Sequence, residues 1–165
     1  MSAAPEGWQI RSARQQDAAE IARLAGLLGY PSGARAVQGR LGELLARPDH
    51  RIVVAAPVAV SEGGAPGAKV GGWMHAARHL TLESAEFAEI LGLIVDPAAR
   101  RTGLGRTLVA EAERWARAHR FARLTVRSNV VRAESHAFYP ALGFTLRKSQ
   151  HIYAKALGPD VGPVA

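Results

Sequence analysis

The chain has 165 residues, a length that fits one domain with a self-supporting hydrophobic core. Hydrophobic residues make up 48% and charged residues 21%, which excludes disorder for most of the chain, and the absence of cysteine excludes disulfides, thiolate nucleophiles and cysteine-ligated metals. The net charge of +7 comes from 18 Arg and 3 Lys that are scattered along the chain, without the basic stripe and interleaved aromatics typical of nucleic-acid binding. We therefore expect no nucleic-acid partner; a small polyanionic ligand would also suit the positive charge.

The first half of the chain predicts a flexible arm at 1–7, followed by strands and two helices. Asp17 stands at a helix N-cap position, because apolar residues recur at helical spacing directly after it. A turn-rich break at 29–33 and the sequence at 46–50 delimit the second helix. The predicted elements are a strand at 8–13, a helix at 18–29, a second helix with Val37, Leu41, Leu44 and Leu45 as its apolar stripe, and strands at 51–60 and 69–78 around a hairpin loop at 61–68.

The run 86–95 is the strongest strand candidate in the second half, since its near-continuous apolar sequence indicates burial on both faces. The alternation of strands and helices around it predicts a mixed sheet with helices packed on it, in a single α/β (α+β) domain over 8–157. The other predicted elements are a connector at 79–84, a helix at 103–119, a strand at 122–128, a short helix at 132–142, one or two strands at 143–157 and a flexible tail at 158–165.

A loop rich in glycine and arginine joins the 86–95 strand to the next helix. Glycine lets a ligand approach the backbone closely, and the first N–H groups of a helix lie at its positive end without internal partners. Arg100, Arg101 and Arg106 add cationic donors beside Gly103 and Gly105. Together these features predict a phosphate site.

The spacing within this loop excludes two common nucleotide motifs. The pattern G-x-x-x-x-G-K-[ST] is absent, and Leu108 stands where the dinucleotide fingerprint needs its third glycine. The pattern that remains is R-x-x-G-x-G, formed by Arg100, Gly103 and Gly105.

Two motifs make the sequence resemble the GNAT superfamily of N-acetyltransferases. The family's acyl-CoA loop, V-x-P-x-x-[RQ]-x-x-G-x-G/A, is matched from Val95 through Pro97 and Arg100 to Gly105. The stretch RSNVVRAESHAFYPALGF at 127–144 is similar to the family's C-terminal motif. The resemblance covers roughly residues 8–157 and implies a mixed, mostly antiparallel central sheet flanked by helices, with two splayed central strands.

The resemblance also implies acetyl-CoA as co-substrate and the places where it binds. Its pyrophosphate would lie on the backbone amides of about 101–106, and its pantetheine would pair like an extra strand with the end of the strand 87–96. That strand often has a bulge in the family, and Gly92 is compatible either with a bulge or with relief of crowding. The implied CoA-binding residues are Leu93, Ile94, Val95, Arg100, Arg101, Thr102, Gly103, Leu104, Gly105, Arg106, Asn129, Ala133, Phe138 and Tyr139.

Tyr139 is the general acid that the resemblance implies, because the departing thiolate benefits from a proton. Phe138 and Tyr139 are adjacent, so on a helix their side chains point about 100° apart, Phe138 into the core and Tyr139 toward the cleft. The alternative is a structural Tyr139 with its hydroxyl at the surface. Pro140 departs from the family pattern and predicts a kink that would re-aim Tyr139.

Glu89 is the candidate general base, directly or through water. The attacking amine must be neutral, whereas a typical alkylamine has a pKa near that of lysine, about 10.4. Strand alternation puts Glu89 on the same side as Leu91 and Leu93, and the alternative is a carboxylate at the wet end of the strand. A backbone N–H near Ile94 or Val95 would stabilise the oxyanion.

We predict no metal site. His75 and His79 have the spacing of a metal pair on a helix, but on a strand they would lie about 13 Å apart.

The leading hypothesis is an acyl-CoA-dependent N-acetyltransferase that passes acetyl directly to a primary amine of a small molecule. Aminoglycosides, polyamines, other small amines and protein N-termini or lysines remain open as acceptors, and a non-catalytic acyl-CoA-binding module is the alternative from another class. No apolar run approaches the roughly 18 residues of a membrane span, and no signal peptide is visible. We therefore expect a cytoplasmic protein with no membrane partner, and a homodimer is left open.

Overall fold

The computed structural model describes residues 4–58 and 68–158. The chain divides into a first unit that extends to Arg127 and a second unit that begins at Ser128. The predicted hairpin loop at 61–68 lies almost wholly outside the described residues, as do the start of the arm at 1–7 and most of the tail at 158–165. The expectation of one domain over 8–157 remains a prediction.

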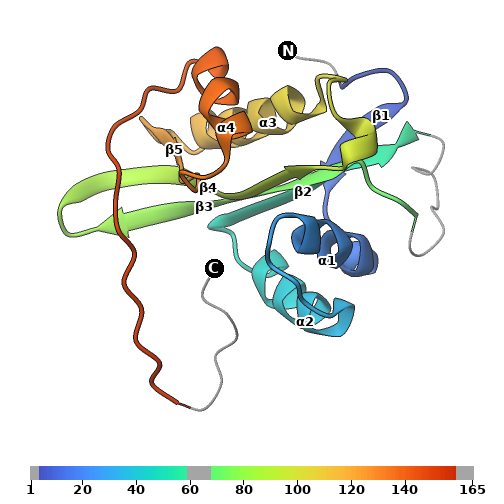
Figure 1. Ribbon diagram of the computed structural model, residues 1–165, viewed down its shortest axis with the longest axis horizontal. Helices are drawn as coiled ribbons and strands as arrows, with labels where there is room; N and C mark the ends of the chain where they lie inside the picture. The colour runs from blue at the N-terminus through green and yellow to red at the C-terminus, as the bar shows by residue number, and fades with distance from the viewer. Residues whose placement is uncertain (1–3, 59–67, 159–165) are drawn as a thin grey trace. The chain divides into compact units, whose positions relative to one another are not determined.

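One five-stranded sheet forms the frame of the first unit, in the order β1-β2-β3-β4-β5 (Figure 1). The first four strands pair antiparallel, and β5 joins β4 in parallel. The mixed, mostly antiparallel sheet is therefore confirmed. The strands are β1 (Trp8–Ser12), β2 (His50–Pro57), β3 (Gly72–Thr81), β4 (Ser84–Val95) and β5 (Leu124–Val126).

Helices cover both faces of this sheet (Figure 1). Helices α1 and α2 pack on one face, whereas α3 lies on the other and connects β4 to β5. The second unit holds α4. The helices are α1 (Ala18–Leu27), α2 (Ala34–Leu45), α3 (Leu104–Ala118) and α4 (Ala133–Phe138), with 3₁₀ turns η1 (Gln15–Asp17), η3 (Pro97–Ala99) and η4 (Pro140–Leu142).

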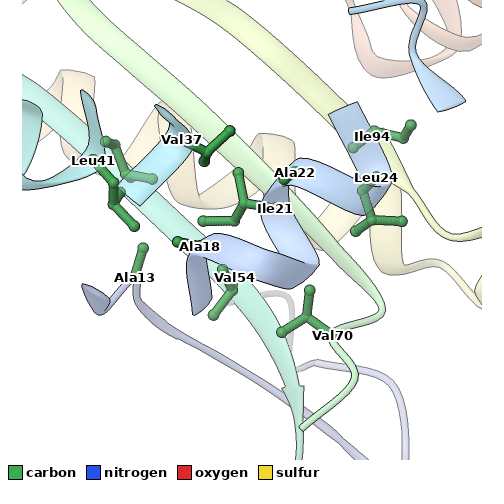
Figure 2. Close-up of a cluster of buried hydrophobic side chains, with 11 residues drawn as sticks. Ala13, Ala18, Ile21, Ala22, Leu24, Val37, Leu41, Val54, Val70 and Ile94 are labelled. Atoms are coloured by element: carbon green, nitrogen blue, oxygen red, sulfur yellow. The ribbon is translucent and has the colours of Figure 1, made fainter. Parts of the chain in front are cut away.

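The apolar stripes of the helices form the core on each side of the sheet. Figure 2 shows the cluster beneath α1 and α2, where Leu24 and Val54 are fully buried. On the opposite face, α3 buries Leu108 and Ala112 completely. Burial of apolar side chains on both faces makes the sheet a rigid platform for its edges and loops. The cluster beneath α1 and α2 consists of Ala13, Ala18, Ile21, Ala22, Leu24, Val37, Leu41, Ile52, Val54, Val70 and Ile94.

Among the described residues, no helix is both long and apolar enough for a membrane crossing.

Two expectations for the first unit are wrong. The region 79–84 is not a connector, because β3 continues to Thr81 and β4 already begins at Ser84, with a tight turn between them. Asp17 precedes α1 but does not cap it with its side chain. Its carboxylate accepts a hydrogen bond from Arg14 N at 2.7 Å and pairs with Arg11 at 2.8 Å, because Asp17 ends η1 with helical backbone angles.

The second unit also differs from expectation. The helix predicted at 132–142 is divided, since α4 ends at Phe138 and Pro140 starts η4. No strand lies within 143–157, all of which the structure describes, and apolar side chains there are exposed. A lone strand would leave its ladder of N–H and C=O groups unpaired, and the described part of the second unit offers no other strand.

Candidate active site

Strand β4 has a bulge beside Gly92. His75 of β3 pairs with Gly92 and the next residue, Ala76, pairs with Ile90, so Leu91 is an extra residue on β4. A side chain at Gly92 would also collide with the ring of Trp73, because a Cβ there would lie 2.6 Å from it. Gly92 therefore both adjoins a bulge and relieves crowding against Trp73.

The two central strands separate just before this bulge. Pairing between β4 and β5 ends at Ile90 and Val126, whereas β4 continues to Val95. This separation is the expected splay. Beyond Ile90, the side of β4 that faced β5 has lost its partner strand.

Backbone groups of β4 face this open edge. Asp96 N donates to Gly71 O at 2.8 Å, which makes Gly72 and Val95 a non-hydrogen-bonded pair of the β3–β4 ladder. By alternation, the N–H and C=O groups of Leu93 and Val95 then point away from β3. Ile94, in contrast, directs its backbone toward β3, so Val95 rather than Ile94 offers a free N–H.

Asp96 fixes the loop that follows β4. Its Oδ1 accepts a hydrogen bond from Ala98 N at 2.9 Å, and its Oδ2 pairs with Arg23 of α1 at 2.7 Å. These two donors hold the pKa of Asp96 below its usual range. Arg23 also pairs with Glu20 of the same helix. The start of the loop is therefore tied to α1.

The loop turns sharply into α3 through two left-handed residues. Gly103 is the N-cap of α3 with φ +89°, and Arg101 has φ +61°, a conformation that costs a non-glycine residue energy. Thr107 N donates to Gly103 O at 3.1 Å and starts the helical ladder. The amides of residues 104–106 have no intrahelical acceptor, and no described side chain caps the helix at Gly103.

The predicted loop residues contribute in different ways. The arginine side chains at positions 100, 101 and 106 are exposed and border the start of α3. Thr102 donates its hydroxyl to Ala99 O at 2.8 Å and thereby braces the loop. The Leu104 side chain is buried in the core, so only its backbone is available to a ligand. The arrangement is a positively charged rim around unpaired amides, which suits a phosphate group.

Glu89 lies elsewhere on β4 and is only 3% exposed, so the reading of a carboxylate at the wet end of the strand is wrong. Its Oε1 lies 2.9 Å from Arg127 Nε, Arg127 Nη2 donates to Oε2 at 3.3 Å, and His79 Nε2 lies 3.3 Å from Oε2. Arginine forks suit carboxylates because they donate two parallel hydrogen bonds. The pair spans β4 and the residue after β5, directly before the strands separate.

Strand alternation gave the wrong neighbours for Glu89. The register pairs Glu89 with Ala77 and Gly92 with His75, and positions 75 and 77 share one face of β3. Leu93 instead pairs with Met74, on the other face. The extra residue at the bulge reverses the alternation, so Glu89 shares a face with Gly92 and Ile94 and not with Leu93.

Two further histidines lie on that face. His50 Nδ1 and His75 Nε2 are 2.8 Å apart, so at least one of the two rings must be neutral. Burial lowers the pKa of His75 to about 4 and also lowers that of His50. Among the described residues, no group of three or more His, Cys, Asp or Glu side chains is arranged to hold a metal ion.

The second unit contains the other predicted site residues. Tyr139 is half-buried, its ring meets the rings of Phe138 and Phe144 edge-on, and burial raises the pKa of its hydroxyl. Phe138 is half-buried as well, so it is not the core residue that was expected. Asn129 Oδ1 accepts a hydrogen bond from Val131 N at 3.1 Å, and Ala133 is exposed at the start of α4.

The sequence matches a family model over most of its length. The family is described as "Acetyltransferase (GNAT) family", and the match covers residues 19–144. The chain belongs to the GNAT acetyltransferases. This membership confirms the expected acyl-CoA-dependent N-acetyltransferase, whereas a search of the curated proteins found no match.

Solved structures share the GNAT fold with this chain. The aminoglycoside 6'-N-acetyltransferase AAC(6')-Ih from Acinetobacter baumannii is 19% identical with a TM-score of 0.75, over 92% of this chain and 100% of that one. The aminoglycoside N-acetyltransferase AAC(6')-Iy, solved in complex with CoA, is 18% identical with a TM-score of 0.75, over 90% and 94%. A GNAT family acetyltransferase from Staphylococcus aureus is 18% identical with a TM-score of 0.70, over 90% and 99%.

Several residues around the candidate site were not predicted from the sequence. His79 and Arg127 contact Glu89, and Trp73 covers Gly92 with its Nε1 buried and without a hydrogen-bond partner in the described structure. Alternation on β3 puts Trp73, His75 and His79 on one face, but their contacts with β4 depend on a register that includes the bulge.

Proposed function

We propose that this GNAT enzyme transfers an acetyl group from acetyl-CoA directly to a primary amine of a small molecule. The observation that carries the proposal is the open edge of β4, which leads into an arginine-rimmed loop and an uncapped helix start. The backbone groups at the edge can form strand-like hydrogen bonds, and the loop that follows can bind an anion. Both lie on one continuous stretch of chain. CoA has an extended amide-containing arm and a pyrophosphate, which suit these two features in that order.

For CoA we propose the following division of contacts. The backbone groups of Leu93 and Val95 pair with the pantetheine amides, and Val95 N–H is the donor nearest to the developing oxyanion. The amides of residues 101–106, with Arg100, Arg101 and Arg106, hold the pyrophosphate. Asn129, Ala133, Phe138 and Tyr139 of the second unit remain proposed contacts on the resemblance alone.

Proton transfer is assigned to two groups. Glu89 accepts the proton of the amine through a water, because burial and its contacts leave little room for a direct approach by the amine. Tyr139 donates a proton to the thiolate, and its raised pKa keeps the hydroxyl protonated well into alkaline solution. Since the chain has no cysteine to carry an acetyl group, transfer is direct.

Aminoglycoside acetyltransferases with the same fold support the proposal of a small-molecule acceptor. A protein N-terminus or lysine is the alternative acceptor. The alternative from another class of function is a non-catalytic acyl-CoA-binding module, because the same loop and strand edge would also bind acyl-CoA without any reaction.

The test is acetyl-CoA turnover with a panel of amines, measured as release of the free thiol and as acetylated product by mass. The panel holds aminoglycosides, polyamines, simple alkylamines and peptides with free N-termini or lysines. We expect thiol release that depends on a small amine. Tight acetyl-CoA binding by calorimetry without turnover on any amine would favour the binding module, and turnover confined to peptides would move the acceptor to proteins.

A further inference from the structure

Acetylation of an amine must release a proton at neutral pH. An alkylamine with a pKa of about 10.4 arrives as an ammonium ion, whereas the amide product and the CoA thiol are neutral. The nitrogen lone pair forms the C–N bond, the C–S bond breaks toward the thiolate, and Tyr139 protonates the sulfur. The proton that the nitrogen loses as the amide forms restores Tyr139. An ammonium ion and a thioester thus give an amide, a thiol and one proton. This proton has to reach the solvent in every turnover.

Glu89 cannot deliver this proton to bulk water by itself. Its side chain is only 4% exposed, and Arg127 occupies Oε1 and shares Oε2. A protonated Glu89 would therefore persist unless a neighbouring group takes the proton over.

His79 is the titratable neighbour that connects Glu89 to the outside. Its Nε2 lies 3.3 Å from Glu89 Oε2, and its side chain is 31% exposed. The ring stacks on Phe87 with centroids 5.2 Å apart and an interplanar angle of 13°, which fixes its orientation. Imidazole binds a proton on one nitrogen and releases one from the other, so the ring can pass a proton across itself.

We propose that His79 relays the amine proton from Glu89 to solvent, a role that rests on the proposed function. The proton moves from Glu89 Oε2 to His79 Nε2, and the proton on Nδ1 leaves to water or buffer, which restores Glu89. Proton exchange with water then returns the ring to its Nδ1–H tautomer, so that Nε2 can accept again in the next turnover. No oxidant or further reactant is needed.

The titratable and charged groups near His79 come from β2, β4 and the residues that flank β5. Glu89 of β4 lies against its Nε2, Arg127 after β5 pairs with the same carboxylate, and His50 of β2 interacts electrostatically with the ring. Arg123 lies beyond the stacked ring, 4.4 Å above the centroid of Phe87.

The test is chemical rescue of His79→Ala. At neutral pH in dilute buffer, turnover should fall about tenfold, because the buried Glu89 carboxylate can no longer pass its proton to the solvent through His79. Added imidazole should restore the rate, whereas pyrazole, which has the same shape but is too weakly basic to carry a proton at this pH, should not. His75→Gln is the matched control: this histidine lies on the same strand and face but bonds to His50, so its rate should not depend on buffer concentration.

Each outcome is decisive. Equal rates in His79→Ala and the wild type in dilute buffer, or equal rescue by imidazole and pyrazole, would overturn the relay while leaving the transferase intact. If His79→Ala does not fold, His79→Gln replaces it, and the relay then requires a rate that rises with buffer concentration. Failure of the wild type to turn over any amine would overturn the proposed function and the relay with it.

Discussion

The end of β4 at Val95 and the middle of β4 at Glu89 differ in how they are built. At the end that leads into α3, neighbouring residues supply everything: unpaired backbone groups, a left-handed glycine and three exposed arginines within one short stretch. Near Glu89, the important groups come from three distant places, namely β3, β4 and the residue after β5. The loop after β4 is a local motif, whereas the surroundings of Glu89 are assembled by tertiary structure.

This difference in construction predicts a difference in function. The loop end presents backbone and positive charge and has no buried acid or base, so it can bind an anion but not move a proton. The region around Glu89 has a buried carboxylate and an imidazole but little free surface, so it can move a proton but contributes little to binding.

The largest effect should come from Tyr139→Phe. This change keeps the ring and its contacts with Phe138 and Phe144 but removes the hydroxyl. Turnover should fall by about 10²–10⁴-fold, whereas acetyl-CoA affinity and melting temperature stay the same. Equal turnover in both proteins would exclude the acid role and would indicate that the break at Pro140 directs the hydroxyl elsewhere.

Glu89→Gln should have the next largest effect, about tenfold to a hundredfold at neutral pH. The deficit should shrink as the pH approaches the pKa of the acceptor amine, because neutral amine then becomes abundant and needs no base. A deficit constant from about pH 6.5 to 9.5 would contradict a base, since a carboxylate that only holds a cationic acceptor raises the Michaelis constant and leaves turnover almost unchanged.

Gly103→Val should weaken acetyl-CoA binding by about tenfold and also lower the melting temperature, because φ +89° strains a branched side chain. Gly103→Asn separates the two effects, since asparagine tolerates this conformation. We expect Gly103→Asn to keep most of the stability but still to obstruct the pyrophosphate. Calorimetry that gives Gly103→Asn the wild-type affinity would show that close backbone approach at this residue does not matter.

Much of the loop end could be predicted from the sequence, because its residues are consecutive and each has an intrinsic preference: glycine for positive φ, arginine for phosphate, the helix start for anions. The strands, the helices and the splay followed from periodicity and from the family motif. The surroundings of Glu89 could not be predicted, since the bulge at Leu91 reverses the alternation beyond it and the contacts with His79 and Arg127 depend on how β3 and β5 pair with β4. The strands expected at 143–157 failed for a related reason: apolar patterning does not say which strand would pair with them.

The smallest expected effect concerns stability. His75 has a pKa of about 4 in the folded chain and about 6.5 in the unfolded chain, so the stability gained by keeping it neutral is present above pH 6.5 and is lost as the pH falls toward 4. The slope of the unfolding free energy in this window should approach about 1.4 kcal/mol per pH unit. Denaturant titrations should show the slope reduced in His75→Gln and unchanged in the control His136→Gln, whose side chain is exposed. An equal slope in all three proteins would mean that His75 is not held neutral.

The most direct test of the division between the loop after β4 and the Glu89 region compares Arg106→Gln with Glu89→Gln in one kinetic and calorimetric series. Arg117→Gln serves as the control, because it makes the same substitution at the exposed far end of α3. Arg106→Gln should weaken acetyl-CoA binding by about tenfold with little change in turnover at saturation, whereas Glu89→Gln should lower turnover without any change in acetyl-CoA affinity. If both variants change the same constant, or if Arg117→Gln weakens binding as much as Arg106→Gln does, the loop after β4 and the Glu89 region do not divide binding from proton transfer.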